Sequence, residues 1–501
     1  MPQNDTPRFL YTSQAVKALD KLAVEKLKIT AYQLMCRAGE AAFSILTKRW
    51  PTAKSIAVFC GSGNNGGDGL VLARLAKKAG LTVNVYQVGD VNKLSEEAQL
   101  ARTDWEKSGG KIIPFAANDI TADVIVDALL GTGTRAPLAM PFQQAINAIN
   151  LSKRAVLAID LPSGLNVDQG VPLEVTIQAD LTITFVGMKI GLLTGEAINF
   201  VGELFFDDLG VNDEIAQAVQ PLAESLNYRE LIKMLPVRKP NDHKGDHGHV
   251  LIIGAGHTGY AGAVCLAGEA ALRAGSGLVS AVVAPESLPL MARSPAELMC
   301  YAMETPAELQ ALLARATVVV LGSGFGQTPW AEQFFKAGLK VAQPKVVDAD
   351  GLNWLAKFPQ KQQNWILTPH PGEAARLLGT TTQIIQHDRI KAAQQLREKF
   401  GGVIVLKGAG TIILDQEDHI YLNAGGFAGL ASGGTGDVLA GLIGGLLAQG
   451  LSLSLAARIG VNVHTRAAGL EDTMGSRGMI ASDLLQPIRH CLNPEQRLSP
   501  P

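Results

Sequence analysis

Residues 55–88 read SIAVFCGSGNNGGDGLVLARLAKKAGLTVNVYQV and hold three patterns in succession. Residues 55–60 are an apolar run of strand length, residues 61–69 are rich in glycine, and residues 70–79 repeat apolar side chains at helical spacing. A second strand-like run follows at residues 82–88. A strand, a glycine-rich connection, a helix and a second strand form a βαβ unit, whose two strands lie parallel. The stretch therefore predicts an α/β domain in which helices cover both faces of a parallel sheet.

The glycine-rich segment has two interpretations. The spacing Gly61-x-Gly63-x-x-Gly66 matches the dinucleotide-binding motif, and Asp90 follows at about the distance of a ribose-binding carboxylate. However, the run Asn-Gly-Gly-Asp-Gly at residues 65–69 is richer in polar groups than a pyrophosphate turn requires. This excess of polar groups argues against a plain dehydrogenase.

Two further predicted strands of the first half lead into polar residues. One ends at Asp127, and the other is followed by Asp160 and Ser163. Since the carboxyl ends of parallel strands share one edge of the sheet, these side chains and Asn65 are expected to meet in one crevice. Their oxygens suit an alkali or alkaline-earth cation, with one carboxylate left for proton transfer. The alternative is that each aspartate only caps the turn that follows it.

The second half again consists of strands that end in polar or glycine-rich loops. Its predicted strands are residues 249–253, 317–321, 345–347, 364–367 and 403–406. His370 follows the fourth of these and is either a substrate ligand or a fixed loop residue between two prolines. Lys407 follows the fifth and either binds a nucleotide phosphate or stands in a solvated turn.

Residues 433–441 read GGTGDVLAG and predict a loop that leads into a helix N-terminus. Backbone amides and the helix dipole at such a point attract an anion such as phosphate. Asp437 would be repelled by that anion unless it had a chemical role, and a suitable role is to accept a proton from a hydroxyl that attacks phosphorus. The alternative is an ordinary acidic residue in the first turn of a helix.

Composition limits the possible functions. With 501 residues the chain is expected to form two or three domains. A net charge of −2 without runs of Lys or Arg argues against nucleic-acid and membrane-surface partners and favours small metabolites. Five scattered cysteines indicate reduced thiols in a cytoplasmic protein and argue against zinc. Residues 1–5 contain no apolar signal core, and residues 438–457 predict a buried helix and its successor rather than a membrane span.

Taken together, the motifs of both halves resemble those of the bifunctional NAD(P)H-hydrate repair enzymes, over nearly the whole chain. The motifs that carry the resemblance are NNGGDG at 64–69, GTG at 131–133, DLPSG at 160–164, TPHPGE at 368–373, KGAGT at 407–411 and GGTGD at 433–437. The resemblance implies a Rossmann-like three-layer epimerase domain over residues 10–217 and a ribokinase-like α/β dehydratase domain over residues 225–498. The boundary is expected near residues 217–225, where the pattern of the core loosens.

For the first domain, the resemblance implies epimerisation of the R and S hydrates of NADH and NADPH, with Asp160 as the proton-transfer group. Potassium would be held by Asn65, Asp127 and Ser163. The hydrate would be bound by Asn64, Asn65, Gly66, Gly67, Asp68, Gly131, Thr132, Gly133, Thr134, Arg135, Ala136, Pro137 and Asp160.

For the second domain, the resemblance implies dehydration of the S hydrate to NAD(P)H, with ADP as co-substrate, magnesium as cofactor, and release of AMP and phosphate. Asp437 would act as the base. The hydrate would lie against Ala263, Gly326, His370 and Asp437, and the nucleotide against Lys407, Gly408, Ala409, Gly410, Thr411 and Gly436.

Two other functions are compatible with the residues. One is a ribokinase-like kinase for a small molecule such as a vitamin precursor, which would release a stable phosphorylated product. The other assigns the first domain a binding or scaffolding role without turnover. In each case a homo-oligomer of the cytoplasm is expected.

Overall fold

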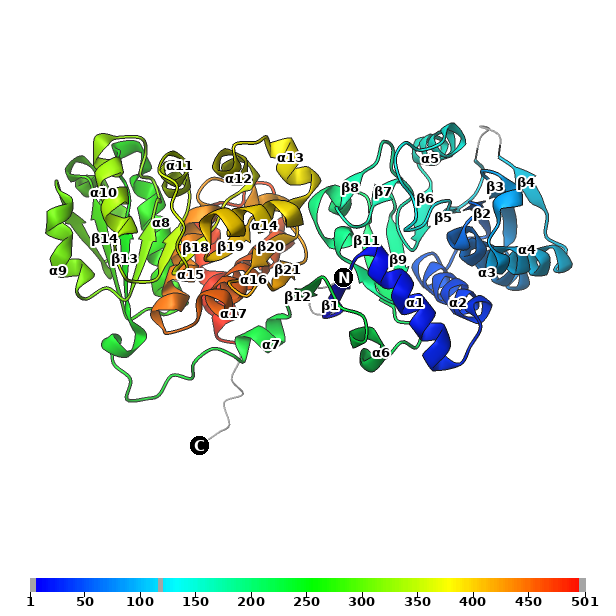
Figure 1. Cartoon of the computed structure of the whole chain (residues 1–501), viewed down its shortest axis with the longest axis horizontal. Coiled ribbons are helices and arrows are strands. Elements are labelled where there is room, and N and C mark those ends of the chain that lie inside the picture. Colours follow the sequence, from blue (N-terminus) through cyan, green and yellow to red (C-terminus); the bar gives the residue numbers. More distant parts are fainter. Residues whose placement is uncertain (1–5, 116–119, 495–501) are drawn as a thin grey trace. The chain divides into compact units, whose positions relative to one another are not determined.

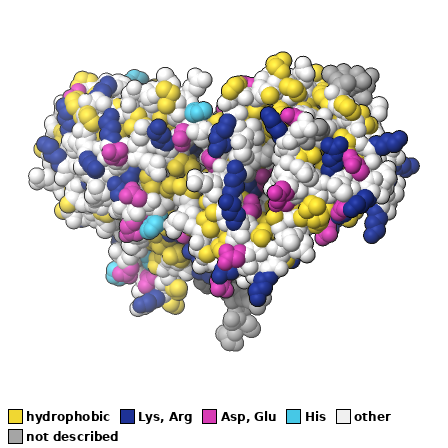
Figure 2. Space-filling view, turned by 45° about the vertical axis from the view of Figure 1, so that its right-hand side comes forward, with side chains coloured by type: hydrophobic (Ala, Val, Ile, Leu, Met, Phe, Trp, Pro, Cys, Tyr) yellow, Lys and Arg dark blue, Asp and Glu magenta, His cyan; other side chains and the backbone are white. Residues whose placement is uncertain are grey.

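The computed structural model describes residues 6–115 and 120–494, and the polar N-terminus 1–5 and residues 495–498 of the predicted second domain lie outside this part. The chain forms two compact units, Met1–Ser225 and Leu226–Pro501. They are coloured blue to green and green to red in Figure 1. Among the described residues, no helix combines the length and the apolar character needed to cross a membrane. On the face drawn in Figure 2, basic and acidic side chains are interspersed.

The first unit is built on a seven-stranded sheet with the order β11-β9-β6-β5-β2-β3-β4. All of its neighbouring strands are parallel. The strands are β2 (Ser55–Cys60), β3 (Thr82–Gln87), β4 (Ile112–Pro114), β5 (Val124–Ala128), β6 (Ala155–Ile159), β9 (Leu181–Phe185) and β11 (Glu203–Asp207). A smaller group pairs β1 (Phe9–Tyr11) with β10 (Met188–Lys189) and β12 (Ala223–Ser225).

Helices cover both faces of this sheet, because successive strand residues point to opposite sides. Ile56 and Val58 pack in a core with the helices of one face, whereas Ala57 and Phe59 pack in a second core with α5. The helices of the first face are α1 (Ser13–Leu27), α2 (Ala31–Arg49), α3 (Asn64–Lys78) and α4 (Glu96–Lys107), and the other face carries α5 (Met140–Ser152). The short helix α6 (Asp213–Gln217) follows β11. The predicted Rossmann-like three-layer fold is confirmed.

The second unit has a larger sheet in the order β21-β20-β19-β18-β17-β16-β13-β14-β15. The pairs from β15 to β19 are parallel, and β20 and β21 form an antiparallel edge. The strands are β13 (His249–Ile253), β14 (Leu278–Val283), β15 (Leu298–Ala302), β16 (Val318–Leu321), β17 (Lys345–Val347), β18 (Trp365–Leu367), β19 (Val403–Leu406), β20 (Thr411–Leu414) and β21 (Ile420–Asn423). This mainly parallel sheet confirms the predicted ribokinase-like α/β fold.

Helices again lie on both faces of the sheet. One face packs against α8 (Ala261–Ala274), α15 (Thr435–Ala448), α16 (Leu453–Glu471) and α17 (Leu485–Leu492). The sheet also contacts α10 (Pro329–Leu339) and α14 (Arg389–Phe400). The remaining helices are α7 (Tyr228–Ile232), α9 (Gln310–Leu313), α11 (Asp350–Lys357), α12 (Pro371–Leu378) and α13 (Thr382–His387).

The apolar residues 438–457 form the predicted buried helix and its successor, α15 and the start of α16. Glycines let α15 approach α8 closely. A Cβ added at Gly441 would lie 2.0 Å from the carbonyl oxygen of Ala267, and one at Gly445 would lie 2.6 Å from that of Ala271. The glycine content of this helix therefore reflects close helix packing.

The predicted loops after the strands are shorter than expected. Helix α3 starts at Asn64, not at residue 70, so the run at residues 65–69 is helical. Its glycines allow close packing: a Cβ at Gly66 would lie 2.1 Å from the carbonyl oxygen of Gly61. Tertiary contacts here outweigh the low helix propensity of glycine. In the same way Ala263, Asp350 and Glu373 lie in the first turns of α8, α11 and α12.

Candidate active sites

A cavity of about 1200 Å³ lies at the carboxyl ends of β2, β5 and β6 in the first unit. Its wall includes residues of α1 and α2, the start of α3, and the loop that follows β5. This is the position at which open α/β sheets bind ligands. The residues predicted for hydrate binding that line it are Asn64, Asn65, Asp68, Gly131, Thr132, Gly133, Thr134, Arg135, Pro137 and Asp160.

Three other residues predicted for hydrate binding do not line this cavity. Gly66 and Gly67 are buried, with Gly66 against the backbone of Gly61 and Gly67 against the side chain of Met35. Ala136 belongs to the cavity loop but is not part of the wall. The two glycines therefore position the start of α3, and their contact with a ligand stays a prediction.

Asp160 directly follows β6 and forms an ion pair with Lys189, with 2.5 Å between its Oδ1 and the Lys189 Nζ. Its backbone adopts a left-handed conformation with φ of 67°, which is unusual for a residue other than glycine. The side chain of Lys189 is only 1% exposed, and its ammonium also donates to the hydroxyl of Thr184 at 2.9 Å and the carbonyl of Phe185 at 3.3 Å. Lys189, fixed by these two acceptors, holds the Asp160 carboxylate at the cavity wall.

Sequence reasoning missed Lys189 and Asp20, although both line the cavity. Lys189 stands between apolar residues in the sequence, and a lysine in such a run is a signal for a buried ion pair. Asp20 lies in α1, far from any strand end. Burial raises the pKa of Asp20 to about 6, with the neighbouring Lys189 opposing this shift and Asp160 adding to it. No local pattern marks Asp20.

The predicted potassium ligands Asn65, Asp127 and Ser163 are brought together around Leu130. The Asp127 carboxylate accepts from the Ser163 hydroxyl at 2.6 Å and from its amide at 2.7 Å. The Leu130 amide donates to the Ser163 hydroxyl, and the Asn65 amide group donates to the Leu130 carbonyl. Burial raises the pKa of Asp127 to about 6.

This cluster has donor atoms suited to a cation. The buried Oδ1 of Asn65 has no hydrogen-bond partner among the described residues. An orphaned carbonyl oxygen next to a carboxylate and a hydroxyl is a hard-oxygen donor set, which fits an alkali cation.

In the second unit, Asp437 lies in the first turn of α15, as predicted. The helix starts after Gly434, whose φ of 93° favours glycine. The Oδ1 of Asp437 is buried and accepts no hydrogen bond from the described part of the chain. Burial raises the pKa of Asp437 to about 6, and the nearby Asp348 carboxylate adds to the shift. A carboxylate in this state is a suitable proton acceptor near neutral pH.

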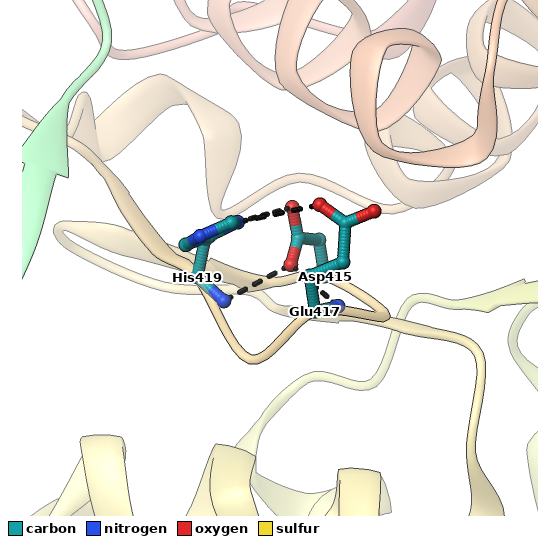
Figure 3. Close-up of side chains that lie close together, drawn as sticks. All are labelled: Asp415, Glu417 and His419. Carbon is teal, nitrogen blue, oxygen red and sulfur yellow. Dashed lines mark hydrogen bonds and ion pairs between the residues drawn. The ribbon is translucent and has the colours of Figure 1, made fainter.

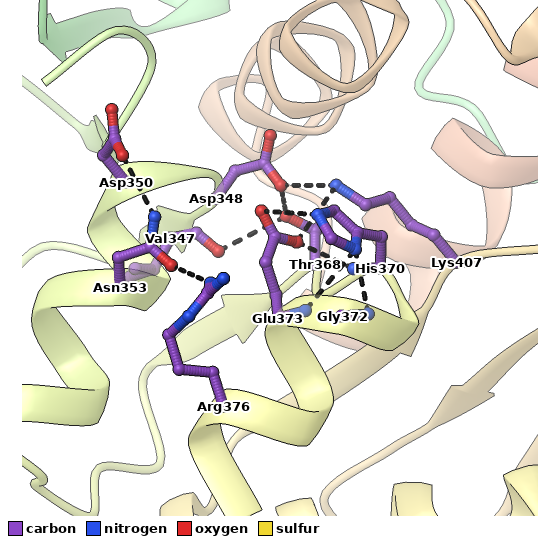
Figure 4. Close-up of polar contacts among 10 residues, drawn as sticks. All are labelled: Val347, Asp348, Asp350, Asn353, Thr368, His370, Gly372, Glu373, Arg376 and Lys407. Atoms are coloured by element: carbon purple, nitrogen blue, oxygen red, sulfur yellow. Dashed lines mark hydrogen bonds and ion pairs between the residues drawn. The ribbon is translucent and has the colours of Figure 1, made fainter. Parts of the chain in front are cut away.

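The Lys407 ammonium reaches into a polar network, entering from the right in Figure 4. Its Nζ is 2.7 Å from the Asp348 Oδ1 and 3.8 Å from the Glu373 Oε2. Asp348 also accepts from the Thr368 hydroxyl at 2.7 Å. Burial alone would lower the pKa of Lys407, but the carboxylates of Asp348 and Glu373 outweigh burial and raise it. A Cβ added at Gly436 would lie 3.3 Å from the Lys407 Nζ, so this cation lies beside the start of α15.

His370 is the N-cap of α12 rather than a free loop residue. Its Nδ1 accepts from the amides of Gly372 and Glu373, and the amide of His370 donates to the Glu373 carboxylate at 2.7 Å. The side chain is 55% exposed, with Nε2 lying 3.5 Å from the Glu373 Oε1. The histidine thus caps the helix and still presents an edge to solvent.

Arg389 binds the segment from Lys407 to Thr411 from the protein interior. The sequence did not single out this arginine. The Arg389 guanidinium is buried and donates to the carbonyls of Leu406, Lys407 and Gly410 at 3.2 to 3.4 Å. Gly408 and Gly410 both have positive φ, which turns the backbone between β19 and β20. Arg389 therefore fixes the turn that was predicted to bind the nucleotide.

Gly326 lies on the turn after β16, and Ala263 lies in the first turn of α8. The Gly326 amide donates to the Asp350 carboxylate at 2.8 Å. Asp350 follows Ala349, whose φ of 49° is unusual for alanine and marks local backbone strain. A Cβ added at Gly324 would lie 3.3 Å from the Ala263 Cβ, so the two turns are in contact. These contacts show that the two segments pack together. The predicted contact of Gly326 and Ala263 with the hydrate stays a prediction.

A third polar group, Asp415, Glu417 and His419, lies in the turn between β20 and β21 (Figure 3). Asp415 is buried and its Oδ1 accepts from the amides of Glu417 and His419, each at 3.0 Å. Glu417 and His419 are mainly exposed. These two hydrogen bonds give Asp415 a structural role, because they stabilise the hairpin turn.

Comparison with known proteins gives matches for both units. Residues 31–191 match the family model described as YjeF-related protein N-terminus, and residues 250–490 match the model described as NAD(P)H-hydrate dehydratase. A solved structure titled ADP/ATP-dependent NAD(P)H-hydrate dehydratase from Bacillus subtilis, co-crystallized with ATP/Mg²⁺, is 28% identical and aligns with 53% of this chain and 95% of its own, at a TM-score of 0.46.

Two relatives that align over nearly the whole chain have the same name. The bifunctional NAD(P)H-hydrate repair enzyme Nnr of Coxiella burnetii is 46% identical over 97% of this chain and 99% of its own length. The Escherichia coli enzyme of the same name is 43% identical over 98% of this chain and 95% of its own. At this identity and coverage, the resemblance found in the motifs is confirmed. The chain belongs to the family of bifunctional NAD(P)H-hydrate repair enzymes.

Proposed function

We propose that the first unit interconverts the R and S hydrates of NADH and NADPH, and that the second dehydrates the S form with ADP, releasing AMP and phosphate. The names of the whole-length relatives support the pair of activities. The observation that carries the proposal for this chain is the position of Asp437. A carboxylate at a helix N-terminus whose buried Oδ1 has no hydrogen-bond partner among the described residues is costly to maintain, and proton transfer next to a bound phosphate gives it a role.

Epimerisation takes place in the cavity of the first unit. The hydrate carries a hydroxyl on C6 of the reduced nicotinamide ring, next to the ring nitrogen. Asp160, held by Lys189, exchanges a proton with a group on C6. The wall formed by residues 131–135 and Pro137 binds the remainder of the dinucleotide, with Arg135 as its cation.

Potassium fits beside this site, held by Asn65, Asp127 and Ser163. Bound potassium would supply a fixed positive charge. The unpaired Asn65 oxygen and the Asp127 carboxylate would be its ligands. The residues themselves tie the start of α3 to the loops after β5 and β6, since Asn65 and Ser163 both bond Leu130. The cavity wall is thereby kept in place.

Dehydration requires a better leaving group than hydroxide. Asp437 accepts the proton of the C6 hydroxyl as that oxygen attacks the β-phosphorus of ADP, and the bond to AMP breaks. Amides at the start of α15 and the Lys407 ammonium stabilise the developing negative charge. The ring nitrogen's lone pair then expels phosphate, and loss of a proton from C5 restores the reduced nicotinamide.

The nucleotide lies along residues 407–411 and Gly436 in this proposal. Arg389 supports that turn from the protein interior. Magnesium, when bound with the nucleotide, would supply charge neutralisation for the phosphates.

Incubation of the pure full-length protein with mixed hydrates and ADP tests the proposal. Absorbance of reduced nicotinamide and released AMP should rise together, and the hydrate pool should be consumed completely because the first unit converts the R form. Accumulation of a stable phosphorylated product would instead support a kinase. Conversion that stops when only the R form remains would indicate a first unit that binds without turnover.

A further inference from the structure

Four aspartates line the cavity of the first unit, and three of them, Asp20, Asp68 and Asp160, interact with one another. Asp160 is paired with Lys189. Asp20 of α1 and Asp68 of α3 also face the cavity, yet no described residue gives their carboxyls a hydrogen bond or an ion pair. Polar groups that are turned toward a cavity without protein partners are available to a ligand.

The three carboxyls and Lys189 are close enough to interact electrostatically. Burial raises the pKa of Asp68 well above its ordinary value, and Asp160 and Asp20 add to the rise while Lys189 opposes it. Lys189 faces all three carboxyls and, among the described residues, forms an ion pair only with Asp160. Burial and the neighbouring carboxylates favour the protonated form of Asp68, which can give up a proton, whereas Asp160 is positioned by an ammonium.

Epimerisation needs two proton-transfer groups. Inverting C6 requires that the hydroxyl leaves from one face of the ring and that an oxygen arrives on the other. A proton must be supplied on departure and removed on arrival, and one group cannot reach both faces of a flat ring at once. The structure holds two suitable groups in one cavity, on elements that approach it separately: α3 and the loop after β6.

We propose that Asp68 is a second catalytic residue of the first unit, which acts on the face of the nicotinamide ring opposite to Asp160. This inference rests on the epimerase function proposed above.

For one epimer, the Asp68 carboxyl gives its proton to the C6 hydroxyl, the C6–O bond breaks with its electron pair, and water leaves. The lone pair of N1 forms a C6=N1 double bond. A water then adds to the other face, its oxygen bonding to C6 while the C6=N1 electron pair returns to N1, and its proton passes to the Asp160 carboxylate. Before the next turnover in the same direction, Asp160 releases its proton to water and Asp68 takes one up from water. The other epimer uses the same two groups in opposite roles.

Other charged groups on the cavity wall do not replace Asp68. Burial raises the pKa of Asp20 only to about 6, and Lys17 on the same helix helps to keep it ionised. Asp20 is thus a neighbour that favours the proton on Asp68. The remaining charged wall residues are Lys17, Lys21, Asp90, Lys93, Glu97 and Arg135.

The experiment compares Asp68→Asn and Asp68→Glu with the wild type in the full-length protein, using the R hydrate. Asp68→Asn should lower kcat for epimerisation by about 100-fold or more with little change in KM. Asp68→Glu should recover part of kcat, and the alkaline limb of the wild-type pH profile should be absent in Asp68→Asn. Glu96→Gln is the matched control, because it removes an exposed carboxylate from α4 that does not line the cavity and should retain wild-type kcat.

Folding of each variant is checked by its thermal unfolding and by its KM. Reaction of the R hydrate in oxygen-18 water should place one solvent oxygen on C6 of the S product. Equal kcat in Asp68→Asn and wild type, or full retention of the original oxygen, would overturn the inference. A wild-type protein that does not interconvert the hydrates at all would instead overturn the proposed function.

Discussion

Replacing Asp437 by Asn should remove dehydration and at the same time stabilise the second unit. Asn keeps the shape of the side chain but cannot accept a proton, so conversion of the S hydrate should fall by about 100- to 10,000-fold. Interconversion of R and S hydrates should be unaffected, because the cavity of the first unit contains neither Asp437 nor its neighbours.

The stability gain follows from the pKa of Asp437, which burial raises from 3.8 to about 6. A carboxyl whose pKa is higher in the folded state binds its proton more tightly there. The fold is therefore destabilised by this group above pH 6, and stability returns as the pH falls toward 3.8. A shift of about two pH units corresponds to about 3 kcal/mol, which Asp437→Asn should restore at pH 8 and hardly at all at pH 4.

The assays are dehydration of pure S hydrate with ADP and urea unfolding followed on the second unit at both pH values. The wild-type dehydration rate should also fall about tenfold per pH unit below pH 6, as the Asp437 carboxylate takes up a proton. An Asp437→Asn protein that dehydrates the S hydrate at the wild-type rate would refute the catalytic reasoning. Equal free energies of unfolding for the wild type and Asp437→Asn at pH 8 would refute the destabilisation that is assigned to the ionised Asp437 carboxylate.

Three further predictions concern the first unit. Asp160→Ala should lose R and S interconversion by about 100-fold while dehydration of pure S hydrate continues, as measured by chromatography of the hydrates. Gly66→Ala should destabilise the unit by about 1–3 kcal/mol in urea unfolding, because its Cβ would lie 2.1 Å from the Gly61 carbonyl oxygen, whereas Gly63→Ala meets nothing within 4 Å and should be neutral. Exchange of potassium for choline should slow epimerisation in the wild type but not in Asn65→Ala, and an unchanged ion response in that variant would argue against the cation site.

Most strands could be predicted from the sequence, because parallel strands buried on both faces are short apolar runs bounded by glycine and polar residues. Strands β2, β13 and β17 begin and end where the sequence indicated. The first residues of the helices were harder to predict from the sequence. The glycines at the start of α3 resemble a loop in sequence, yet contacts with Gly61 and Met35 hold them in a helix. Propensity describes one residue at a time, and these contacts come from distant parts of the chain.

The sequence by itself determined the α/β class, the edge of each sheet at which polar residues gather, and the family to which the chain belongs. Its alternating strand and helix patterns and its ordered motifs carry that information locally. Only the tertiary structure decided that Lys189 pairs with Asp160, that Arg389 supports the turn after Lys407, and that Asp20 and Asp68 share one cavity. The physical reason is that ion pairing and desolvation act over a few ångströms in space, between residues whose positions along the chain give no sign of their proximity.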